Sequence, residues 1–521
     1  MIALLLACVE PDPPRVVSGP EVVQPNPLVP YARELQVAYD RPVTLTITAT
    51  DGRHAIDRVV GPGEAFAVPL AGLYADAAWT VSLDASDGGE VRHRELSFHT
   101  APLPSKVPHL EVRSAIPGAA EPGYTLVPAT IRGAGGWLLA VDLDGEIAWA
   151  FDAGEYPVLA PSAVPSSGGL GSSGSSGFRM LYRDQLIEMD WLGRDVHRLS
   201  ALDDPENALD DDRPPGLPID VPMFHHELHV TDRGTWIGFT REGRTLPSLP
   251  TSYDDPSLRA ETAVTGDQLV ELDPDDGTEL GRWSVSDAID PARIGYGSLE
   301  PAYLGVDWTH TNAVWDRGDE RLVSIRHQDA VLLVDRPSGA LKWILGTPDN
   351  WSPAFQDLLL EPVEVPGGPP FAWPWHQHGA KWLDGDRVLL FDNGNFGTAP
   401  FSGVEPLDGS RITSRVVEYA VDTAARTVSE VWSFTLDPPV YSSAMGDADE
   451  LPNGHVLASF AYVQYEDHQP MAAFGRGSPS ARVVEFDPAT GQVVWDLDVF
   501  ALAGEEADSW QVVRAARFAG F

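Results

Sequence analysis

Cysteine is almost absent from this chain, since Cys8 is the single example among 521 residues. One thiol cannot close an intramolecular disulfide, so the fold has to be stabilised by burial and hydrogen bonding. Because Cys8 stands at the extreme N-terminus, the body of the chain also offers no thiol nucleophile. A disulfide-stapled scaffold and cysteine-dependent catalysis are therefore both excluded.

Basic residues are scarce as well. Lysine and arginine number 35 against 77 aspartates and glutamates, which gives a formal net charge of −42. A field of this sign repels nucleic acid, so a DNA or RNA partner is excluded. It also repels small anions at long range, and an anionic substrate would therefore need a local positive pocket. The acidity otherwise serves solubility.

Long hydrophobic runs are missing too, and no segment reaches the roughly 20 apolar residues of a membrane-spanning helix. The N-terminal run MIALLLACVE is too short and lacks the basic start of a signal peptide, which a start codon placed too far downstream would explain. Its Leu-Leu-Ala-Cys end resembles a bacterial lipoprotein processing box. We predict a lipoprotein-type signal segment over residues 1–8, a lipid anchor at Cys8 as the only membrane contact, and a periplasmic or cell-surface location.

Glycine and proline are abundant, at 48 and 46 residues, and the apolar runs between them are short. This composition is typical of many short strands joined by turns, so we predict an all-β fold. Residues 9–25 are proline-rich and indicate a tether. Residues 26–103 carry short alternating runs and indicate a small β-sandwich of fibronectin/Ig-like type.

A strand-turn-strand pattern then recurs, with an apolar run, an aspartate, a turn, and a tryptophan or other apolar residue. Its six copies begin at Ala140, Ile187, Val270, Leu333, Val417 and Val484. Repeats at long, uneven intervals are typical of a propeller with large loops between its strands. We therefore predict a six-bladed β-propeller over residues 108–521.

Three hairpins between these copies begin with a histidine. His226, His310 and His378 precede the turn glycines Gly234, Gly318 and Gly385 by eight, eight and seven residues. An antiparallel hairpin returns the chain to the level where it began. The innermost strands of a propeller converge on its central channel, so we expect the three imidazoles to meet at one mouth of that channel.

The residues that return to that level follow from the same count. Arg326 should lie beside His310 and Asn312, Asp392 and Asn393 beside His378, and Arg241 near His226. The remaining neighbouring histidines have no such register, and we interpret them as structural or supporting residues. They are His225, His229, His327 and His376.

Imidazoles with an arginine and asparagines suit a multi-oxygen anion held by charge-assisted hydrogen bonds, with one histidine as nucleophile. Three histidines could instead bind zinc. Arg326 would repel the metal, however, and no carboxylate shares the register of the histidines, so we expect no metal. Tryptophans near these hairpins suit a flat apolar ring attached to the anion. They are Trp308, Trp373, Trp375 and Trp382.

At this point the sequence resembles the bacterial aryl-sulfate sulfotransferases, which act without 3′-phosphoadenylyl sulfate. The resemblance covers nearly the whole chain and is carried by the segments HHELHV, DWTHTNAV, SIRHQDAV and QHGAKW…FDNGN. It implies a transiently sulfated nucleophile at His378 and sulfuryl-binding or acid/base groups at His310, Arg326, His226 and Asn312. Asn393, Trp375 and Trp308 are expected to complete the substrate site. Some relatives carry a disulfide that this chain cannot form.

The resemblance also implies an aryl sulfate donor, a phenolic acceptor and ping-pong transfer without a cofactor, with a homodimer as the candidate assembly. Three alternatives stay open. The chain could be a non-catalytic surface lipoprotein propeller that binds glycans or aryl ligands. It could be a quinoprotein-like or metal-dependent oxidoreductase, or a sulfatase that hydrolyses to water.

Overall fold

The computed structural model describes residues 13–131, 135–165, 175–202, 214–407, 409–466, 469–470, 478–501 and 510–521. Cys8 and the predicted signal segment lie outside these residues, so the lipid anchor stays a prediction. In the described residues almost every element is a strand, which confirms the all-β prediction. The exceptions are α1 (Pro353–Gln356) and the 3-10 turns η1 (Val285–Asp287), η2 (Arg326–Gln328) and η3 (Gly409–Arg411). No described helix is long and apolar enough to span a bilayer.

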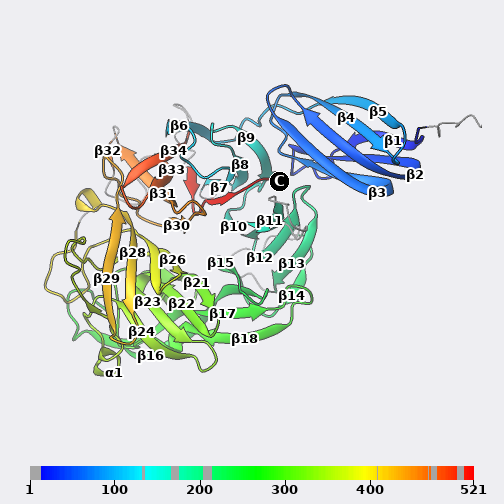
Figure 1. Ribbon diagram of the computed structural model, residues 1–521. Helices are drawn as coiled ribbons and strands as arrows, with labels where there is room; N and C mark the ends of the chain where they lie inside the picture. Colours follow the sequence, from blue (N-terminus) through cyan, green and yellow to red (C-terminus); the bar gives the residue numbers. More distant parts are fainter. Residues whose placement is uncertain are drawn as a thin grey trace, which may run out of the picture.

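The N-terminal part is one antiparallel sheet, drawn in blue in Figure 1. Its strands are β1 (Val16–Val23), β2 (Ala32–Thr50), β3 (Ala55–Ala71), β4 (Ala78–Ser86) and β5 (Val91–His99). The first half of β2 pairs with β1 and with the end of β3, whereas its second half pairs with β4 and the start of β3. Buried and exposed residues alternate along β4, so one face of the sheet is apolar.

β1 corrects the prediction of a tether over residues 9–25. Residues 16–23 are a strand of the sheet, with Val23 opposite Glu34 and Val16 opposite Tyr39. The valines of this segment supply β-propensity that the proline-rich composition concealed. The folded part of the chain therefore begins earlier than the sequence indicated.

Six further sheets are present in the described residues, mostly antiparallel. The first contains β7 (Tyr124–Ile131), β8 (Gly135–Val141), β9 (Ile147–Asp152), β35 (Trp510–Val512) and β36 (Ala516–Phe518). The second contains β10 (Val158–Pro165), β11 (Ser175–Tyr182), β12 (Gln185–Asp190), β13 (Asp195–Ala201) and β14 (Leu217–Ile219). The third contains β15 (His225–Val230), β16 (Trp236–Pro250), β17 (Arg259–Leu272), β18 (Glu279–Ser284), β19 (Pro301–Ala302) and β20 (Gly305–Asp307).

The other three sheets follow along the chain. The fourth contains β21 (Thr311–Arg317), β22 (Glu320–Ile325), β23 (Ala330–Asp335) and β24 (Ala340–Gly346). The fifth contains β25 (Glu361–Pro362), β26 (His378–Leu383), β27 (Arg387–Asp392), β28 (Arg415–Asp422) and β29 (Thr427–Phe434). The sixth contains β30 (Asp447–Glu450), β31 (Val456–Glu466), β32 (Gln469–Pro470), β33 (Ser478–Asp487), β34 (Gln492–Phe500) and β6 (His109–Ala115).

The two ends of this part of the chain exchange strands. β6, which precedes the first sheet, pairs with β34 of the last sheet, and β35 and β36 from the C-terminus pair with β7 of the first. The strands β10, β15, β21, β26 and β30 contact one another in succession, and β36 contacts β10. In Figure 1 the red C-terminal strands accordingly lie beside the cyan ones. Because both ends are paired, the sheets form a closed ring.

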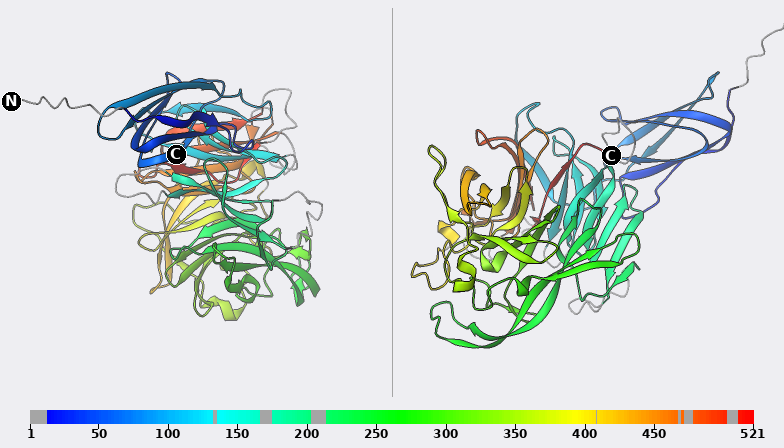
Figure 2. Two further views of the ribbon diagram at one scale, coloured as in Figure 1. Left: turned by 90° about the vertical axis from the view of Figure 1, so that its right-hand side faces the viewer. Right: turned by 60° about the horizontal axis from the view of Figure 1, so that its bottom comes forward.

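The N-terminal sheet lies to one side of this ring, as Figure 2 shows. One apolar cluster runs through both parts and includes Tyr31 and Leu73 of the first with Val127 and Leu497 of the second. The Tyr74 hydroxyl donates to Asp142 at 2.8 Å across the same boundary. The two parts are therefore packed together through a common core.

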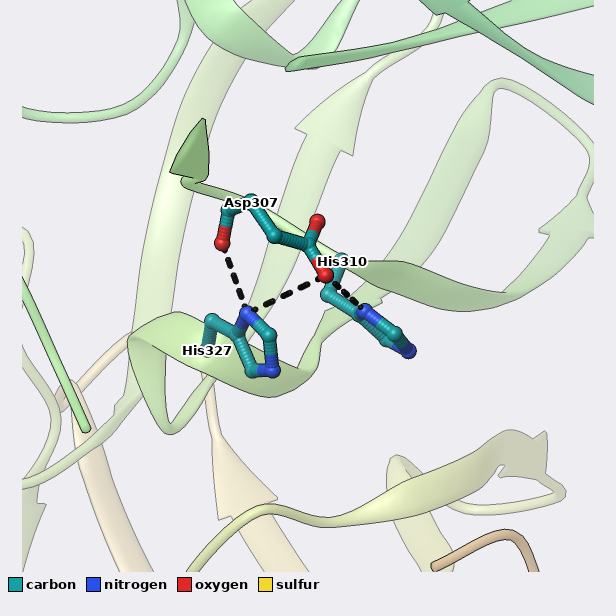
Figure 3. Close-up of side chains that lie close together, drawn as sticks. All are labelled: Asp307, His310 and His327. Atoms are coloured by element: carbon teal, nitrogen blue, oxygen red, sulfur yellow. Dashed lines mark hydrogen bonds and ion pairs between the residues drawn. The ribbon is translucent and has the colours of Figure 1, made fainter. Parts of the chain in front are cut away.

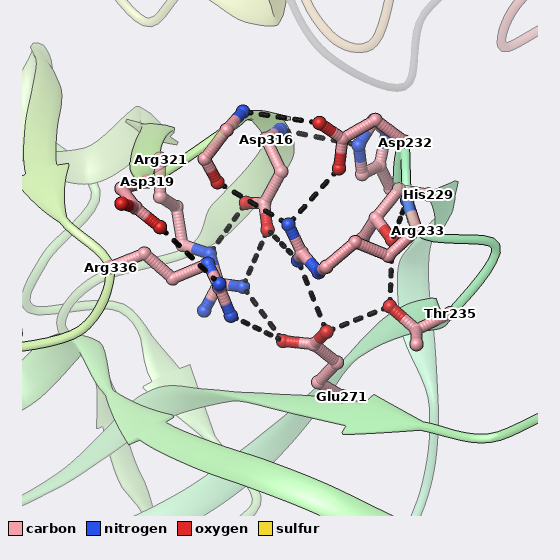
Figure 4. Close-up of polar contacts among 11 residues, drawn as sticks. His229, Asp232, Arg233, Thr235, Glu271, Asp316, Asp319, Arg321 and Arg336 are labelled. Carbon is pink, nitrogen blue, oxygen red and sulfur yellow. Dashed lines mark hydrogen bonds and ion pairs between the residues drawn. The ribbon is translucent and has the colours of Figure 1, made fainter.

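An ionic network joins the third and fourth sheets at the C-terminal ends of β15 and β21, opposite to the ends where His226 and His310 lie (Figure 4). Arg233 contacts both Glu271 and Asp316 at 3.1 Å, and Arg321 contacts Asp316 at 2.7 Å. The His229 Nε2 accepts a hydrogen bond from the Asp316 amide at 3.2 Å. These contacts fix β15 against β21, and they give His229 the structural role that we predicted.

Trp495 on β34 provides a test of ring closure. Its indole is fully buried, donates to the Leu143 carbonyl of the first sheet at 2.9 Å, and lies 5.1 Å from the Arg517 guanidinium. We expect Trp495→Ala to lower the free energy of unfolding by about 3–5 kcal/mol, measured by urea unfolding. Val431→Ala, at an exposed position on β29, should change it by less than about 0.5 kcal/mol. Equal effects would show that closure does not depend on Trp495.

Candidate active site

The three predicted histidines come together at the ends of β15, β21 and β26. The ring centroid of His226 lies 5.0 Å from that of His310 and 6.1 Å from that of His378. The single register that we predicted is not kept, because the equivalent paired positions are His225, Thr311 and His378. Each strand has a pairing irregularity next to its histidine, and such bulges redirect side chains. The three imidazoles thus meet as predicted, but strand bulges and not a shared register bring them together.

Left-handed backbone conformations complete this redirection. His226 has a φ of 58° and His310 a φ of 51°, values that non-glycine residues adopt mainly at constrained sites. Asp267 fixes the second of these, since one carboxylate oxygen accepts from the Thr309 hydroxyl and the Thr311 amide, both at 2.6 Å. The local strain at His310 is therefore held by hydrogen bonds on either side of it.

Asp267 also begins a relay to His226. Its other carboxylate oxygen lies 3.2 Å from the His225 Nε2, and the Nδ1 atoms of His225 and His226 are 2.9 Å apart. Burial would raise the pKa of Asp267, but the hydrogen bonds from His225, Thr309 and Thr311 outweigh burial and lower that pKa. Burial lowers the pKa of His226 well below 6.5, with further lowering by the nearby histidines. His226 is therefore neutral at physiological pH.

His378 has one fixed tautomer. Its Nδ1 lies 2.7 Å from the Gly446 carbonyl oxygen, which can only accept, so Nδ1 carries the proton. The Nε2 atom is buried and has no hydrogen-bond partner among the described residues. Burial first, and then the charge of Arg514, lower the pKa of His378 well below 6.5. The result is a neutral imidazole with an unused Nε2 lone pair, which is the state that a histidine nucleophile requires.

His310 faces a carboxylate instead. Its Nδ1 lies 2.6 Å from an Asp307 oxygen, as Figure 3 shows. Burial opposes ionisation of Asp307, but the hydrogen bond and charge of His310 outweigh it and lower the pKa of Asp307. A carboxylate on Nδ1 orients an imidazole and stabilises its protonated form. The pair has the geometry of a general acid or base.

His327 supports Arg326 rather than binding a metal. Its Nδ1 donates to the Asp307 carbonyl at 2.7 Å, and its Nε2 lies 3.1 Å from an Arg326 Nη. Burial, with the nearby His310 and Arg326, lowers the pKa of His327 well below 6.5, so it is neutral. Asp307, His310 and His327 are close enough for a shared ion. However, the two contacts of His327 leave it no lone pair, and the guanidinium would repel a cation.

Arg326 lies where the hairpin count placed it. Its backbone amide donates to the His310 carbonyl at 3.2 Å, and one Nη donates to the Ser443 carbonyl at 3.1 Å. A guanidinium has five N–H donors, and the side-chain contacts with the Ser443 carbonyl and the His327 Nε2 do not use all of them. It supplies the local positive charge that an anionic substrate needs in this acidic protein.

The side-chain amides of both predicted asparagines donate to backbone carbonyls. The Asn393 amide nitrogen donates to the carbonyls of Ser442 and Met445, at 2.7 and 2.9 Å, which uses both of its N–H groups. The prediction that Asn393 binds substrate through this amide is therefore wrong. The Asn312 amide donates to the Gln377 carbonyl at 2.8 Å and is fully buried. The sequence placed both asparagines near the histidines, but their hydrogen-bond partners lie in segments that are distant in sequence.

The tryptophans are mostly core residues. Trp308 is fully buried, donates to the Arg293 carbonyl at 2.9 Å and packs among aliphatic side chains, so the prediction that it lines the substrate site is wrong. Trp382 stacks on Trp343, and Trp373 packs on Phe371. Trp375 alone of the four predicted walls is both half-buried and next to the histidines in sequence.

Sequence reasoning missed a second group of rings beside the site. Tyr296 stacks on Phe396 with centroids 4.5 Å apart, Tyr253 lies 5.1 Å from Tyr296, and Phe396 lies 5.2 Å from His376. All three are half-buried, and Phe396 has a φ of 65°. Tyr253 and Tyr296 come from loops of the third sheet and Phe396 from a loop of the fifth, where no repeat pattern could have identified them.

His376, which we interpreted as structural, also forms a dyad. Its Nδ1 and its backbone amide both lie 2.8 Å from an Asp329 oxygen, and its Nε2 is buried without a partner among the described residues. Burial is the main cause that lowers the pKa of His376. His376 lies between Phe396 and His327, and the ring centroids of His376 and His327 are 5.8 Å apart.

Imidazoles in three different settings and one guanidinium gather at one end of a closed all-β ring, and this set of groups suits an anionic ligand. The family follows from sequence comparison, because the model described as Arylsulfotransferase (ASST) matches residues 130–511. This is well over half of the chain, so the chain belongs to the arylsulfotransferase family.

One curated relative is the arylsulfate sulfotransferase AssT of Escherichia coli O6:H1 (strain CFT073), 30% identical over 145 residues. The match covers 25% of this chain and 23% of the relative, so the chain spans about a quarter of its length. Among solved structures, a quinonprotein alcohol dehydrogenase-like protein from Bacteroides thetaiotaomicron has a TM-score of 0.30 at 8% identity, covering 97% of this chain and 99% of that one. AztD from Citrobacter koseri has a TM-score of 0.21 at 10% identity, covering 91% and 98%.

The buried neutral histidines predict how stability responds to pH. An unfolded histidine takes up a proton near pH 6.5, whereas folded His378 does not. Because the unfolded state then binds more protons, the free energy of unfolding should fall by about 1.4 kcal/mol per pH unit per such histidine as pH drops below that value. We expect His378→Gln to remove about that much of the slope between about pH 6 and about pH 5, measured by urea unfolding. An unchanged slope would mean that His378 is protonated in the folded protein.

Proposed function

We propose that this protein transfers a sulfuryl group from an aryl sulfate to a phenolic acceptor, with His378 as the covalent carrier. The observation that carries the proposal is the fixed tautomer of His378, whose Nδ1 is bound to the Gly446 carbonyl and whose Nε2 has no hydrogen-bond partner in the part of the chain that the structure describes. Membership of the arylsulfotransferase family supports the reaction class.

In the first half-reaction the Nε2 lone pair of His378 attacks the sulfur. The S–O bond to the aryl group breaks, the phenolic oxygen leaves with the electron pair, and sulfohistidine forms. Arg326 is the fixed cation for the sulfuryl oxygens, and its planar fork suits them. Sulfuryl transfer should resemble phosphoryl transfer in its loose transition state, so positioning and electrostatics supply most of the catalysis.

The proton for the departing phenolate comes from His310 in this proposal. Asp307, 2.6 Å from its Nδ1, stabilises the imidazolium that such a donor must form. His226 is less suited, because burial and the neighbouring histidines hold its pKa well below 6.5. It serves instead as a neutral hydrogen-bonding group beside the sulfuryl position.

In the second half-reaction the acceptor phenol attacks sulfur, the N–S bond breaks, and the phenolic proton returns to His310. The Gly446 carbonyl cannot take the Nδ1 proton, so sulfated His378 remains an imidazolium. A cationic ring is a good leaving group, and this favours transfer to the acceptor without further activation.

We further propose that the six ring sheets are the blades of a six-bladed β-propeller and that residues 16–99 form a fibronectin-like sandwich. The exchange of β6, β35 and β36 between the first and last sheets supports the first assignment. The two sets of partners of β2 support the second. In this architecture the histidines lie at one mouth of the central channel.

A burst experiment tests the carrier. Mixed with 4-nitrophenyl sulfate and no acceptor, the protein should release about one equivalent of 4-nitrophenol per site and then stall, with acid-labile sulfate on the peptide that contains His378. His378→Ala should abolish both burst and label, whereas His376→Ala should keep the label on His378. A label on another residue, or turnover by His378→Ala, would refute the assignment.

The ring group of Tyr253, Tyr296 and Phe396 is the proposed surface for the aryl ring. Loss of one aromatic contact costs on the order of 1 kcal/mol, so Phe396→Ala should raise KM for 4-nitrophenyl sulfate about fivefold. The burst amplitude should not change, because His378 is untouched. Trp432→Ala, at a half-buried position on β29, is the control and should leave KM unaltered. Equal KM values for Phe396→Ala and the unaltered protein would place the aryl group elsewhere, with Trp375 as the next candidate.

A further inference from the structure

Arg514 lies in the middle of the ring although it belongs to the C-terminal segment between β35 and β36. Its side chain is buried, and one Nη contacts both Glu227 carboxylate oxygens, at 2.8 and 2.9 Å. The other Nη donates to the Asn312 carbonyl at 3.0 Å. The guanidinium therefore connects β15, β21 and the C-terminal segment at one point.

The partners of Arg514 are neighbours of the three histidines. Glu227 follows His226 directly, and Asn312 lies two residues after His310. The Asn312 side chain continues the connection, since its amide donates at 2.8 Å to the carbonyl of Gln377, the residue before His378. One guanidinium and one amide thus join all three histidine-bearing strands.

Apolar side chains do not fill the whole ring at this depth. A cavity of about 630 Å³ lies on the same level and beyond it, lined by residues of β10, β15, β21, β26 and β30 and of the C-terminal segment. Arg514 and Glu227 line it, as do Lys381 and Asp447, which are 2.7 Å apart. The contacts of Arg514 with Glu227 and Asn312 therefore connect strands that surround an open part of the ring.

Arg514 also acts on the charge of His378. The charged and titratable groups that face His378 come from several elements: His226 of β15, His310 before β21, Arg326 of η2, and Arg514. Of these, Arg514 is the largest charge that disfavours protonation of His378, after burial. The Lys381 and Asp447 side chains are paired with each other next to it.

We propose that Arg514 is a positioning residue for the three-histidine site, which holds the spacing of the segments that carry His226, His310 and His378. The C-terminal segment is then part of the active site as well as the closure of the ring. The inference rests on the proposed function for its kinetic readout but not for its spectroscopic one.

The experiment compares three variants with a matched control. Arg514→Gln removes the cation, Arg514→Lys keeps the charge but loses the two-pronged contact, and the double change Arg514→Gln with Glu227→Gln removes both charges. The control is Arg482→Gln with Asp496→Asn, a buried pair on β33 and β34 of the last sheet. Release of 4-nitrophenol from 4-nitrophenyl sulfate is measured, and the His378 imidazole is titrated by NMR of protein labelled with [15N]histidine.

We expect Arg514→Gln to slow transfer on the order of 10²-fold, as a small misplacement of reacting groups does. Loss of a nearby cation favours the imidazolium, so the His378 titration midpoint should rise by about one pH unit. Arg514→Lys should slow transfer with little change in the midpoint, and the control pair should change neither.

A folded Arg514→Gln protein with unaltered rate and midpoint would overturn the inference. Should that variant not fold, an unaltered rate in Arg514→Lys and in the double variant would overturn it equally. If the unaltered protein releases no 4-nitrophenol, the proposed function fails, and the His378 titration in Arg514→Gln still decides the inference.

Discussion

Arg514 and Glu227 meet in the centre of the ring although they are 287 residues apart in the chain. Neither could be buried there alone, since removing one partner of such a pair typically costs about 3–5 kcal/mol. Arg514 lies between β35 and β36, which both pair with β7, so the pair connects the closure of the ring to the strands that bring the histidines together.

The large negative charge of the chain and the anion that the site would hold are compatible for a physical reason. The net charge of −42 is spread over the molecule, and between solvent-exposed groups its field is screened within roughly 8–10 Å at physiological ionic strength. Arg326 is close to the histidines and removed from bulk water, so its charge is screened much less. Arg326 thus places a cation beside the histidines within an acidic protein, as the composition required of any anion-binding site here.

The sequence was sufficient for the all-β fold and for the meeting of His226, His310, His378 and Arg326. Turn glycines mark each hairpin, and pairing within a hairpin is local, so the return of Arg326 to His310 follows from counting. The bulges that shift His226 and His310 by one position each could not be counted, because they depend on contacts with other sheets.

The errors share the same origin. Trp308 stands two residues before His310, and only its hydrogen bond to the Arg293 carbonyl decides that it belongs to the core. Asn393 has the right type for an oxyanion donor, but its amide holds the Ser442–Met445 loop, about 50 residues away in sequence. Phe396 and Arg514 lie in segments without repeat character. In each case a long-range partner determines the role.

The partners of the histidine Nδ1 atoms separate their roles. His310 and His376 face the carboxylates of Asp307 and Asp329, whereas His378 faces the neutral carbonyl of Gly446. A carboxylate stabilises imidazolium and so favours proton exchange, which suits an acid or base. A carbonyl fixes the tautomer without favouring the charged ring, which suits a nucleophile that must be neutral before it attacks and easily displaced afterwards. His327 also faces a backbone carbonyl, but its Nε2 contacts Arg326, so the proposed covalent step falls to His378.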